Sequence, residues 1–148
     1  MEINVAQQLK GDVGDVRIYP VEGVMKEGFA VTGEAKLVRT HRSILVTGQF
    51  KCEVPCTCCL CLEEYNQPLD FEIEEEYVSS ERILEGSDGL LEADGFSIGA
   101  RHILDLSEAL RQGISLRLSS RLVCRPECAG LCHTCGYNLN LGPCNCST

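Results

Sequence analysis

Six cysteines crowd into the last 25 residues of the chain, and their spacing limits what this segment can become. Cys132 and Cys135 are separated by two residues, and Cys58 and Cys61 repeat that spacing far upstream. Two intervening residues let one tight turn aim both sulfurs at the same metal ion. The tail is poor in apolar residues, so without a metal it has almost nothing to fold around. The pattern therefore predicts a C-terminal tail ordered by zinc.

The chain carries eleven cysteines, and their setting favours metal ligation over disulfides. Its first residues lack the basic segment and apolar run that mark a secretory signal. No stretch approaches the roughly 20 apolar residues that a membrane helix needs. We therefore expect a cytoplasmic protein with no membrane partner, in a compartment that keeps thiols reduced. Paired cysteines in such a compartment are typical of metal sites or redox thiols.

The tail cysteines supply one complete set of ligands. The run from Cys132 to Gly136 is typical of a zinc knuckle, because a glycine after the second cysteine can turn with positive φ and point backbone amides at the sulfurs. Cys144 and Cys146 can complete a tetrahedral site. A zinc ion bound in this way contributes on the order of 10–16 kcal/mol of apparent binding free energy, which is ample to order a tail without a core.

A second site is predicted from cysteines outside that set. Its ligands would be Cys58, Cys61, Cys124 and Cys128, and it would tie the exit of the C-terminal helix to the sheet. The alternative is a single site that draws on both clusters and leaves free thiols. The predicted cofactor is therefore Zn²⁺, as one ion or two.

Three further cysteines have simpler interpretations. Cys52 lies on the inward face of a predicted strand and is expected to be a buried, unreactive thiol. Cys56 and Cys59 could be surplus, or could replace Cys58 and Cys61 as ligands in a different register. His133 lies inside the tail knuckle, where its ring would point to solvent.

The sequence predicts that the protein is not an enzyme. A zinc ion with four thiolate ligands has no open position for water. The chain has no Ser/His/Asp arrangement, phosphate-binding loop or dinucleotide fingerprint, so no small-molecule substrate is expected. Paired cysteines can also form a redox switch, and four of them can hold iron and sulfide. A thiol redox or iron–sulfur protein is therefore the rival hypothesis.

The remainder of the chain predicts an α+β fold. Apolar and polar residues alternate over 43–56 and 69–77, the period of a strand with one buried face. Further strands are expected at 29–39 and at 16–24, where Pro20 favours an edge position. We expect an antiparallel sheet that could be barrel-like, with Cys58 and Cys61 presented by a hairpin turn.

One main helix is expected over residues 105–118, where Asp105 and Glu108 resemble a capping box. Residues 79–101 are predicted to form a long loop. Residues 1–123 would then form the α+β core, with the cysteine-containing hairpin at 56–62. Residues 124–148 would form a metal-binding tail packed on the same domain.

Charge is segregated along the chain, whose formal net charge is −9. Residues 52–98 hold one basic and 13 acidic groups, whereas residues 1–51 hold seven basic and six acidic groups. Such a chain is repelled by nucleic acid unless its basic groups gather on a separate face. One set of candidates for contacting RNA phosphates is Arg117, Arg121 and Arg125, which are spaced by four and would form one basic stripe if the predicted helix continued that far. The other set is Lys36, Arg39 and Arg42 near a hairpin tip. The alternative is a solvated face.

Two segments resemble a known family. The run Cys58-Cys59-Leu60-Cys61-Leu62-Glu63-Glu64-Tyr65 is similar to the C-x-R-C-L-E-x-F/Y signature of the YceD family of bacteria and plastids, with Leu60 where that signature has arginine. The tail from Cys128 to Asn140, followed by Cys144 and Cys146, resembles the C-x-G-L-C-x-x-C-G-x-N-L-N…C-x-C ending of the same family. The resemblance spans nearly the whole chain, although only these two segments are specific.

The resemblance implies a factor needed for normal accumulation of large-subunit (23S) ribosomal RNA. Its partner would be precursor ribosomal RNA or a ribosome-assembly protein, and its cysteines would be structural zinc ligands. The leading hypothesis is therefore a non-enzymatic ribosome-biogenesis factor. The alternatives are the redox or iron–sulfur protein and a zinc-stapled adaptor that binds only protein.

Overall fold

The computed structural model describes residues 1–79, 95–99 and 101–146, and most of its regular structure is β-strand. The strands predicted over 16–24, 29–39 and 43–56 are confirmed, each to within one residue at its ends. The strand predicted over 69–77 belongs to a longer one. In chain order the elements are β1 (Glu2–Asn4), α1 (Ala6–Lys10), β2 (Val16–Val24), β3 (Ala30–Arg39), β4 (Ser43–Thr57), β5 (Glu64–Ser79), β6 (Phe96–Ile98), β7 (Ile103–Asp105), α3 (Ser107–Arg117) and the short 3-10 helix η1 (Leu139–Leu141).

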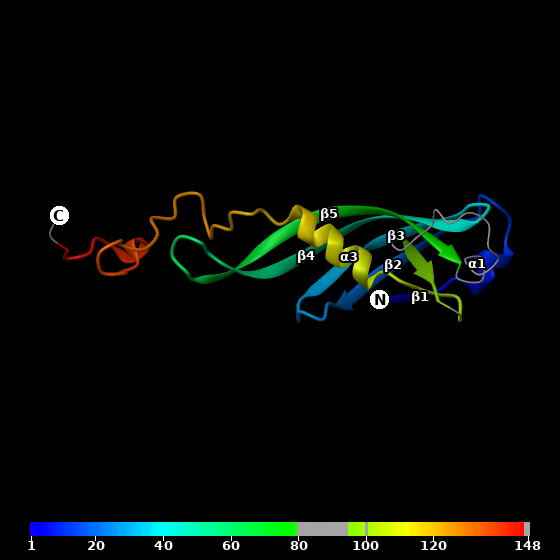
Figure 1. The fold of residues 1–148 in the computed structure, drawn as a ribbon, viewed down its shortest axis with the longest axis horizontal. Coiled ribbons are helices and arrows are strands. Elements are labelled where there is room, and N and C mark those ends of the chain that lie inside the picture. Colours follow the sequence, from blue (N-terminus) through cyan, green and yellow to red (C-terminus); the bar gives the residue numbers. More distant parts are fainter. Residues whose placement is uncertain (80–94, 100, 147–148) are drawn as a thin grey trace.

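The two longest strands, β4 and β5, form an antiparallel hairpin. Their alternate residues face inward, and Phe50 lies opposite Phe71 with the ring centroids 5.8 Å apart. The turn between them lies at one end of the sheet, close to the path of the tail (Figure 1). This turn carries Cys58 and Cys61, as the sequence predicted.

Five strands form one sheet in the order β2-β3-β4-β5-β6, and β1 and β7 form a separate pair. Strands β2 to β5 are antiparallel to their neighbours, as predicted, but β6 pairs parallel to β5. Because β6 falls inside the predicted loop over 79–101, that prediction is wrong for residues 96–98. A strand of three residues is too short to show a period in the sequence. The remainder of the predicted loop, at 80–94 and 100, lies outside the described residues.

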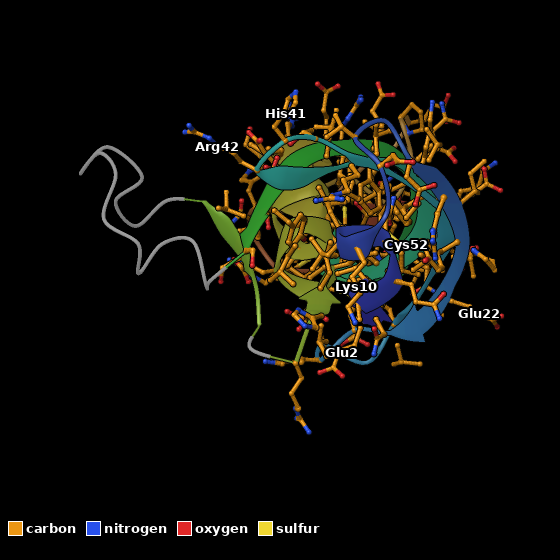
Figure 2. All side chains as sticks on the ribbon, turned by 90° about the vertical axis from the view of Figure 1, so that its right-hand side faces the viewer. Glu2, Lys10, Glu22, His41, Arg42 and Cys52 are labelled. Atoms are coloured by element: carbon orange, nitrogen blue, oxygen red, sulfur yellow. The ribbon has the colours of Figure 1, made fainter. Side chains whose placement is uncertain are left out.

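The large sheet curves strongly around the core, as Figure 2 shows in an end view. Within the described residues, β2 and β6 are its two edges and no strand pairing joins them, so the sheet is open and not a closed barrel. The β1–β7 pair approaches the β2 edge, because the side chain of Met1 packs over Gly23. Pro20 lies in edge strand β2, where a missing N–H is tolerated.

Helix α3 covers the inner face of β5. Its buried residues include Leu110, Gly113 and Ile114. Gly113 permits the close approach, because a Cβ added there would lie 2.9 Å from Cδ2 of Phe71 and 3.1 Å from Cγ2 of Ile73. Glycine lowers helix propensity by about 1 kcal/mol relative to alanine. Close packing of the helix on the sheet offsets that cost.

The ends of α3 differ from the prediction. The carboxylate of Asp105 accepts a hydrogen bond from the Ser107 amide at 2.9 Å, but the residue preceding the helix, Leu106, provides no side-chain cap. Glu108 bonds to the guanidinium of Arg111, one turn along, instead of reaching back. The predicted capping box is therefore wrong, because an i+3 ion pair takes the glutamate.

The tail runs past the β4–β5 turn to the far end of the molecule (Figure 1). Its only helical element is η1 among the described residues. No helix in the described part of the chain has the length and apolar content that a bilayer crossing requires.

Candidate metal centres

The first cluster gathers sulfurs from two distant parts of the chain. Its members are Cys58 and Cys61 of the β4–β5 turn and Cys124 and Cys128 beyond α3, and their Sγ atoms all lie within 4.8 Å of one another. Backbone hydrogen bonds join the same two segments. The amide of Cys59 donates to the carbonyl of Leu122 at 2.8 Å, and the amide of Leu131 donates to that of Leu60 at 3.0 Å. The structure thus brings together the four cysteines predicted for a second site.

The second cluster lies wholly within the tail. Its members are Cys132, Cys135, Cys144 and Cys146, whose Sγ atoms also lie within 4.8 Å of one another. Gly136, directly after the CxxC pair, has φ of +72°, as predicted from its position in the knuckle. The sulfurs therefore form two separate groups of four, and not one mixed group.

The distances between sulfurs suit a single tetrahedral ion in each group. Four ligands at about 2.3 Å from zinc lie about 3.8 Å from one another. The sulfur–sulfur distances are 3.8 Å for Cys58–Cys128, 3.7 Å for Cys61–Cys124 and 3.4 Å for Cys132–Cys144. All exceed the roughly 2.05 Å of a disulfide. A cluster of several iron and sulfide atoms would need wider spacing, because those atoms lie between the cysteine sulfurs. Each group could therefore hold one metal ion.

The two CxxC turns share one backbone geometry. The amide of Leu62 donates to the carbonyl of Cys58 at 2.9 Å, and the amide of Gly136 donates to that of Cys132 at 2.8 Å. In each turn the backbone amide of the first cysteine also donates a hydrogen bond to the carbonyl of the residue five positions later. The residue after the second cysteine is left-handed in both, with φ of +60° at Leu62 and +72° at Gly136. Sequence reasoning found only the second, because leucine does not signal this conformation.

Backbone amides make one thiol in each cluster acidic. Burial opposes ionisation of Cys58, but amide hydrogen bonds, led by that of Cys61, lower its pKa to about 6. The amide of Cys135 similarly lowers the pKa of Cys132 to about 6. In contrast, burial raises the pKa of Cys124 to about 12. Four thiolates in one cluster repel one another, so ionising all of them requires a cation among the sulfurs.

The three cysteines outside the clusters have no shared site in the described residues. Cys52 and Cys56 are buried in the hydrophobic core, and burial raises the pKa of Cys52, which fits the expected unreactive thiol. Cys59 is exposed. The alternative register, in which Cys56 and Cys59 serve as ligands, is not the arrangement found. His133 is exposed and lies outside both groups.

Two tail asparagines connect the clusters, and sequence reasoning gave them no role. Asn140 donates from Nδ2 to Sγ of Cys128 at 3.4 Å. Asn138 donates from Nδ2 to Oε1 of Glu63 at 2.9 Å, and its Oδ1 accepts from the backbone and side-chain amides of Asn140. The Asn-x-Asn pattern in the tail signature was the available signal. These bonds fasten the second cluster to the first and orient a ligand sulfur.

Only the first arginine of the predicted stripe lies on a helix, so the stripe is not formed. α3 ends at Arg117, and the next residue, Leu118, has extended backbone. Arg121 and Arg125 therefore follow in irregular chain, where all three arginines are exposed. Arg117 shares a groove with Asp70 and Glu72. This set therefore runs from the last residue of α3 into the first cluster, where Arg125 directly follows Cys124.

The other predicted basic set is divided. Lys36 lies in β3 and shares a groove with Glu34, Glu72 and Glu74, so its charge is surrounded by acid. Arg39 and Arg42 lie at the β3–β4 turn, at the end of the sheet opposite the cysteines (Figure 1). A single basic patch of all six residues is therefore not formed.

Comparison with known proteins identifies the family. The family model described as "Large ribosomal RNA subunit accumulation protein YceD" matches residues 46–148, a region that contains both clusters. A curated relative from Zea mays, "Large ribosomal RNA subunit accumulation protein YCED homolog 1, chloroplastic", is 49% identical over 37 residues, which are 25% of this chain and only 13% of the relative. No solved structure matches the chain. The chain belongs to the YceD family.

Proposed function

We propose that this protein is a non-enzymatic, cytoplasmic ribosome-biogenesis factor that supports accumulation of large-subunit ribosomal RNA and holds two structural zinc ions. The observation that carries the proposal is the pair of four-sulfur groups, which lie in the region matched by a family named for that RNA. The name of the chloroplast relative points to the same role.

Zinc is the ion that this donor set favours. Tetrahedral four-cysteine sites are typical of structural zinc, and thiolate ligands disfavour the harder divalent ions. With all four positions taken by sulfur, the ion has no position for water or substrate, which supports a structural role. The ligands would be Cys58, Cys61, Cys124 and Cys128 at the first site and Cys132, Cys135, Cys144 and Cys146 at the second.

The two ions would have different structural roles. The first takes two ligands from the β4–β5 turn and two from beyond α3, so it would anchor residues 124–148 to the body formed by residues 1–123. This sharing supports a tail that is part of the same domain. The second ion would order the tip of the tail, which has no buried apolar residues apart from cysteine in the described range 131–146.

The proposed partner is precursor ribosomal RNA. Arg121 and Arg125 are exposed beside the first cluster, and the structure gives neither guanidinium a carboxylate partner within the described residues. They would contact phosphates, with Arg117 contributing less because of its acidic groove. The acidic outer residues of β5, which include Glu72 beside Arg117, would repel phosphates, so the RNA contact would centre on Arg121 and Arg125.

The test combines a cellular and a binding measurement. In cells depleted of the protein, large-subunit ribosomal RNA should fall relative to small-subunit RNA, and the wild-type chain should restore it. In vitro, binding to large-subunit RNA fragments should weaken as the salt concentration rises. For single-stranded RNA, the slope of the logarithm of the binding constant against the logarithm of the salt concentration should become shallower by about 0.7 for each phosphate contact that a mutation removes. Arg121→Gln with Arg125→Gln should reduce that slope. Arg111→Gln, which breaks an existing pair with Glu108, is the control and should not.

The outcomes separate the hypotheses. The proposal is supported if the wild-type chain restores large-subunit ribosomal RNA in depleted cells and binds the RNA fragments with the expected salt dependence. Restored ribosomal RNA without measurable RNA binding would assign the protein to the adaptor class, and unchanged ribosomal RNA on depletion would contradict the proposed function.

A further inference from the structure

A pocket of about 310 Å³ lies at the end of the molecule opposite the tail, away from the proposed zinc sites. It forms where α1, the β3–β4 turn, the end of β5 and the turn before β7 meet. Figure 2 views this end and labels Lys10, His41 and Arg42. Ligand pockets in proteins typically have volumes of about 300–1,000 Å³. The pocket is therefore large enough for a small chemical group or the end of a chain.

The lining of this pocket is basic, although the chain has a net charge of −9. Lys10, Arg39 and Arg42 line it, and the described lining includes no aspartate or glutamate. One carboxylate lies next to the lining: Glu76 accepts a hydrogen bond from the hydroxyl of Ser43, which is a lining residue. Like charges that line a concave surface concentrate their potential inside it. A lining of this charge favours an anion over a cation.

The turn that forms one wall is fixed by its own hydrogen bonds. The amide of Thr40 donates to the carbonyl of Ser43 at 3.0 Å, and Oγ1 of Thr40 accepts from the Ser43 amide at 3.0 Å. The guanidinium of Arg39 donates to the carbonyl of Gly11. The side chain of Arg42 is exposed and has no ion pair within the described residues. A fixed wall loses little conformational entropy when a ligand binds.

Another lining residue has an unusual backbone conformation. His102 lines the pocket with φ of +57°, in the left-handed region. Its carbonyl accepts from the amide of Val5 at 2.9 Å, and its own amide donates to the carbonyl of Gly99 at 2.8 Å. A residue other than glycine in this region costs of order 1–3 kcal/mol and persists where its surroundings enforce it, often at binding sites. The backbone of His102 is thus fixed by hydrogen bonds on both sides, which keeps this residue in the pocket wall.

We propose that this pocket binds a phosphate monoester, as carried by the end of an RNA chain. A terminal phosphate has a charge of about −1.5 to −2 and three acceptor oxygens, which match guanidinium and ammonium donors. A concave site admits a chain end, whereas a duplex or a continuous strand needs an open surface. The choice of RNA as the source rests on the proposed function, because a mononucleotide presents the same group.

The test compares internally labelled oligoribonucleotides that carry a 5′-phosphate, a 3′-phosphate or neither. Wild-type protein should bind one phosphorylated form at least tenfold more tightly than the unphosphorylated form. Arg42→Gln with Lys10→Gln should abolish this preference. His102→Asn should reduce it severalfold, because asparagine tolerates the left-handed backbone but lacks the imidazole. Lys26→Gln with Lys51→Gln is the charge-matched control, because both lysines lie toward the opposite end of β3: Lys26 precedes Ala30, and Lys51 pairs with Thr32.

Competition by AMP identifies the source of the phosphate. Tighter binding of the oligonucleotide than of AMP assigns the site to an RNA end, and equal binding assigns it to a nucleotide; both support a phosphate monoester site. Equal affinity for all three oligonucleotides, or a preference that survives in the double variant, overturns the proposal. This readout does not depend on ribosomal RNA levels, so a failure of the proposed function would be seen separately.

Discussion

The side-chain amide of Asn138 donates a hydrogen bond to Oε1 of Glu63 at 2.9 Å, across 75 residues of sequence. Glu63 follows the first CxxC pair and Asn138 follows the second, so this bond joins the two family signatures. Nearby, Asn140 donates to the sulfur of Cys128. The two clusters are therefore coupled through polar side chains as well as through the backbone.

The coupling between Glu63 and Asn138 is measurable as an interaction energy. In a double-mutant cycle with Glu63→Ala and Asn138→Ala, we expect about 0.5–1.5 kcal/mol of coupling in the free energy of unfolding, the usual worth of such a hydrogen bond. Glu63→Gln keeps the acceptor oxygen and should retain most of the stability. Urea unfolding of the metal-loaded protein checks this, and strictly additive single changes would show that the bond does not form.

Because the two CxxC turns share one geometry, substitutions at the residue after the second cysteine, Leu62 in the first turn and Gly136 in the second, should have opposite effects on stability. Leu62 is left-handed and exposed, so Leu62→Gly should leave stability unchanged or raise it by up to about 1 kcal/mol. Gly136→Leu places a Cβ in the same strained conformation and should cost about 1–2 kcal/mol. Thermal unfolding of both variants makes the comparison. A clear loss of stability in Leu62→Gly would mean that the first turn is not left-handed.

Gly113 provides a test of the packing between α3 and β5. Alanine is the better helix former by about 1 kcal/mol, yet its Cβ would lie 2.9 Å from the ring of Phe71. We expect Gly113→Ala to destabilise the protein by about 1–3 kcal/mol, as overpacked cores do. Ser115→Ala, on the exposed face of the same helix, should change stability by less than about 0.5 kcal/mol. An increase in stability for Gly113→Ala would place the helix farther from the sheet.

Single cysteine substitutions should separate the two proposed ions. Cys58→Ser and Cys144→Ser should each remove one zinc ion per chain, and Cys59→Ser, whose thiol is exposed outside both groups, should remove none. Only Cys58→Ser should release the tail from the body, because only the first site takes ligands from both. Metal analysis together with limited proteolysis near residues 122–131 provides the measurement. Equal protease sensitivity in both ligand variants would contradict the anchoring role.

The sequence predicted much of the fold because long alternating strands carry a strong period. The strands β2, β3 and β4 and the CxxC turn between β4 and β5 follow directly from alternation and spacing. The parallel strand β6 was missed, since three residues carry no period. The predicted capping box was wrong, because residue types alone do not show that Glu108 pairs with Arg111.

The tail group of cysteines could be predicted because its ligand spacing is a local property. The pairing of Cys58 and Cys61 with Cys124 and Cys128 joins distant segments, so the sequence left a single shared site open as the alternative. The glycine in the second turn was also predictable, whereas the same backbone conformation at Leu62 was not. The Asn-x-Asn pattern could mark Asn138 and Asn140, but their partners Glu63 and Cys128 depend on contacts across the fold, which the local sequence does not encode. The same is true of the basic pocket, whose lining comes from four separate segments of the chain.

The most direct test of the central claim is the metal content and visible absorption of the full chain, purified without oxygen or chelators. Two sets of four sulfurs within 4.8 Å predict two zinc ions per chain and a colourless protein, with one ion lost in each of Cys58→Ser and Cys144→Ser. A chain that contains no metal while its tail remains protected from protease, or one that is brown and contains iron and sulfide, would contradict it.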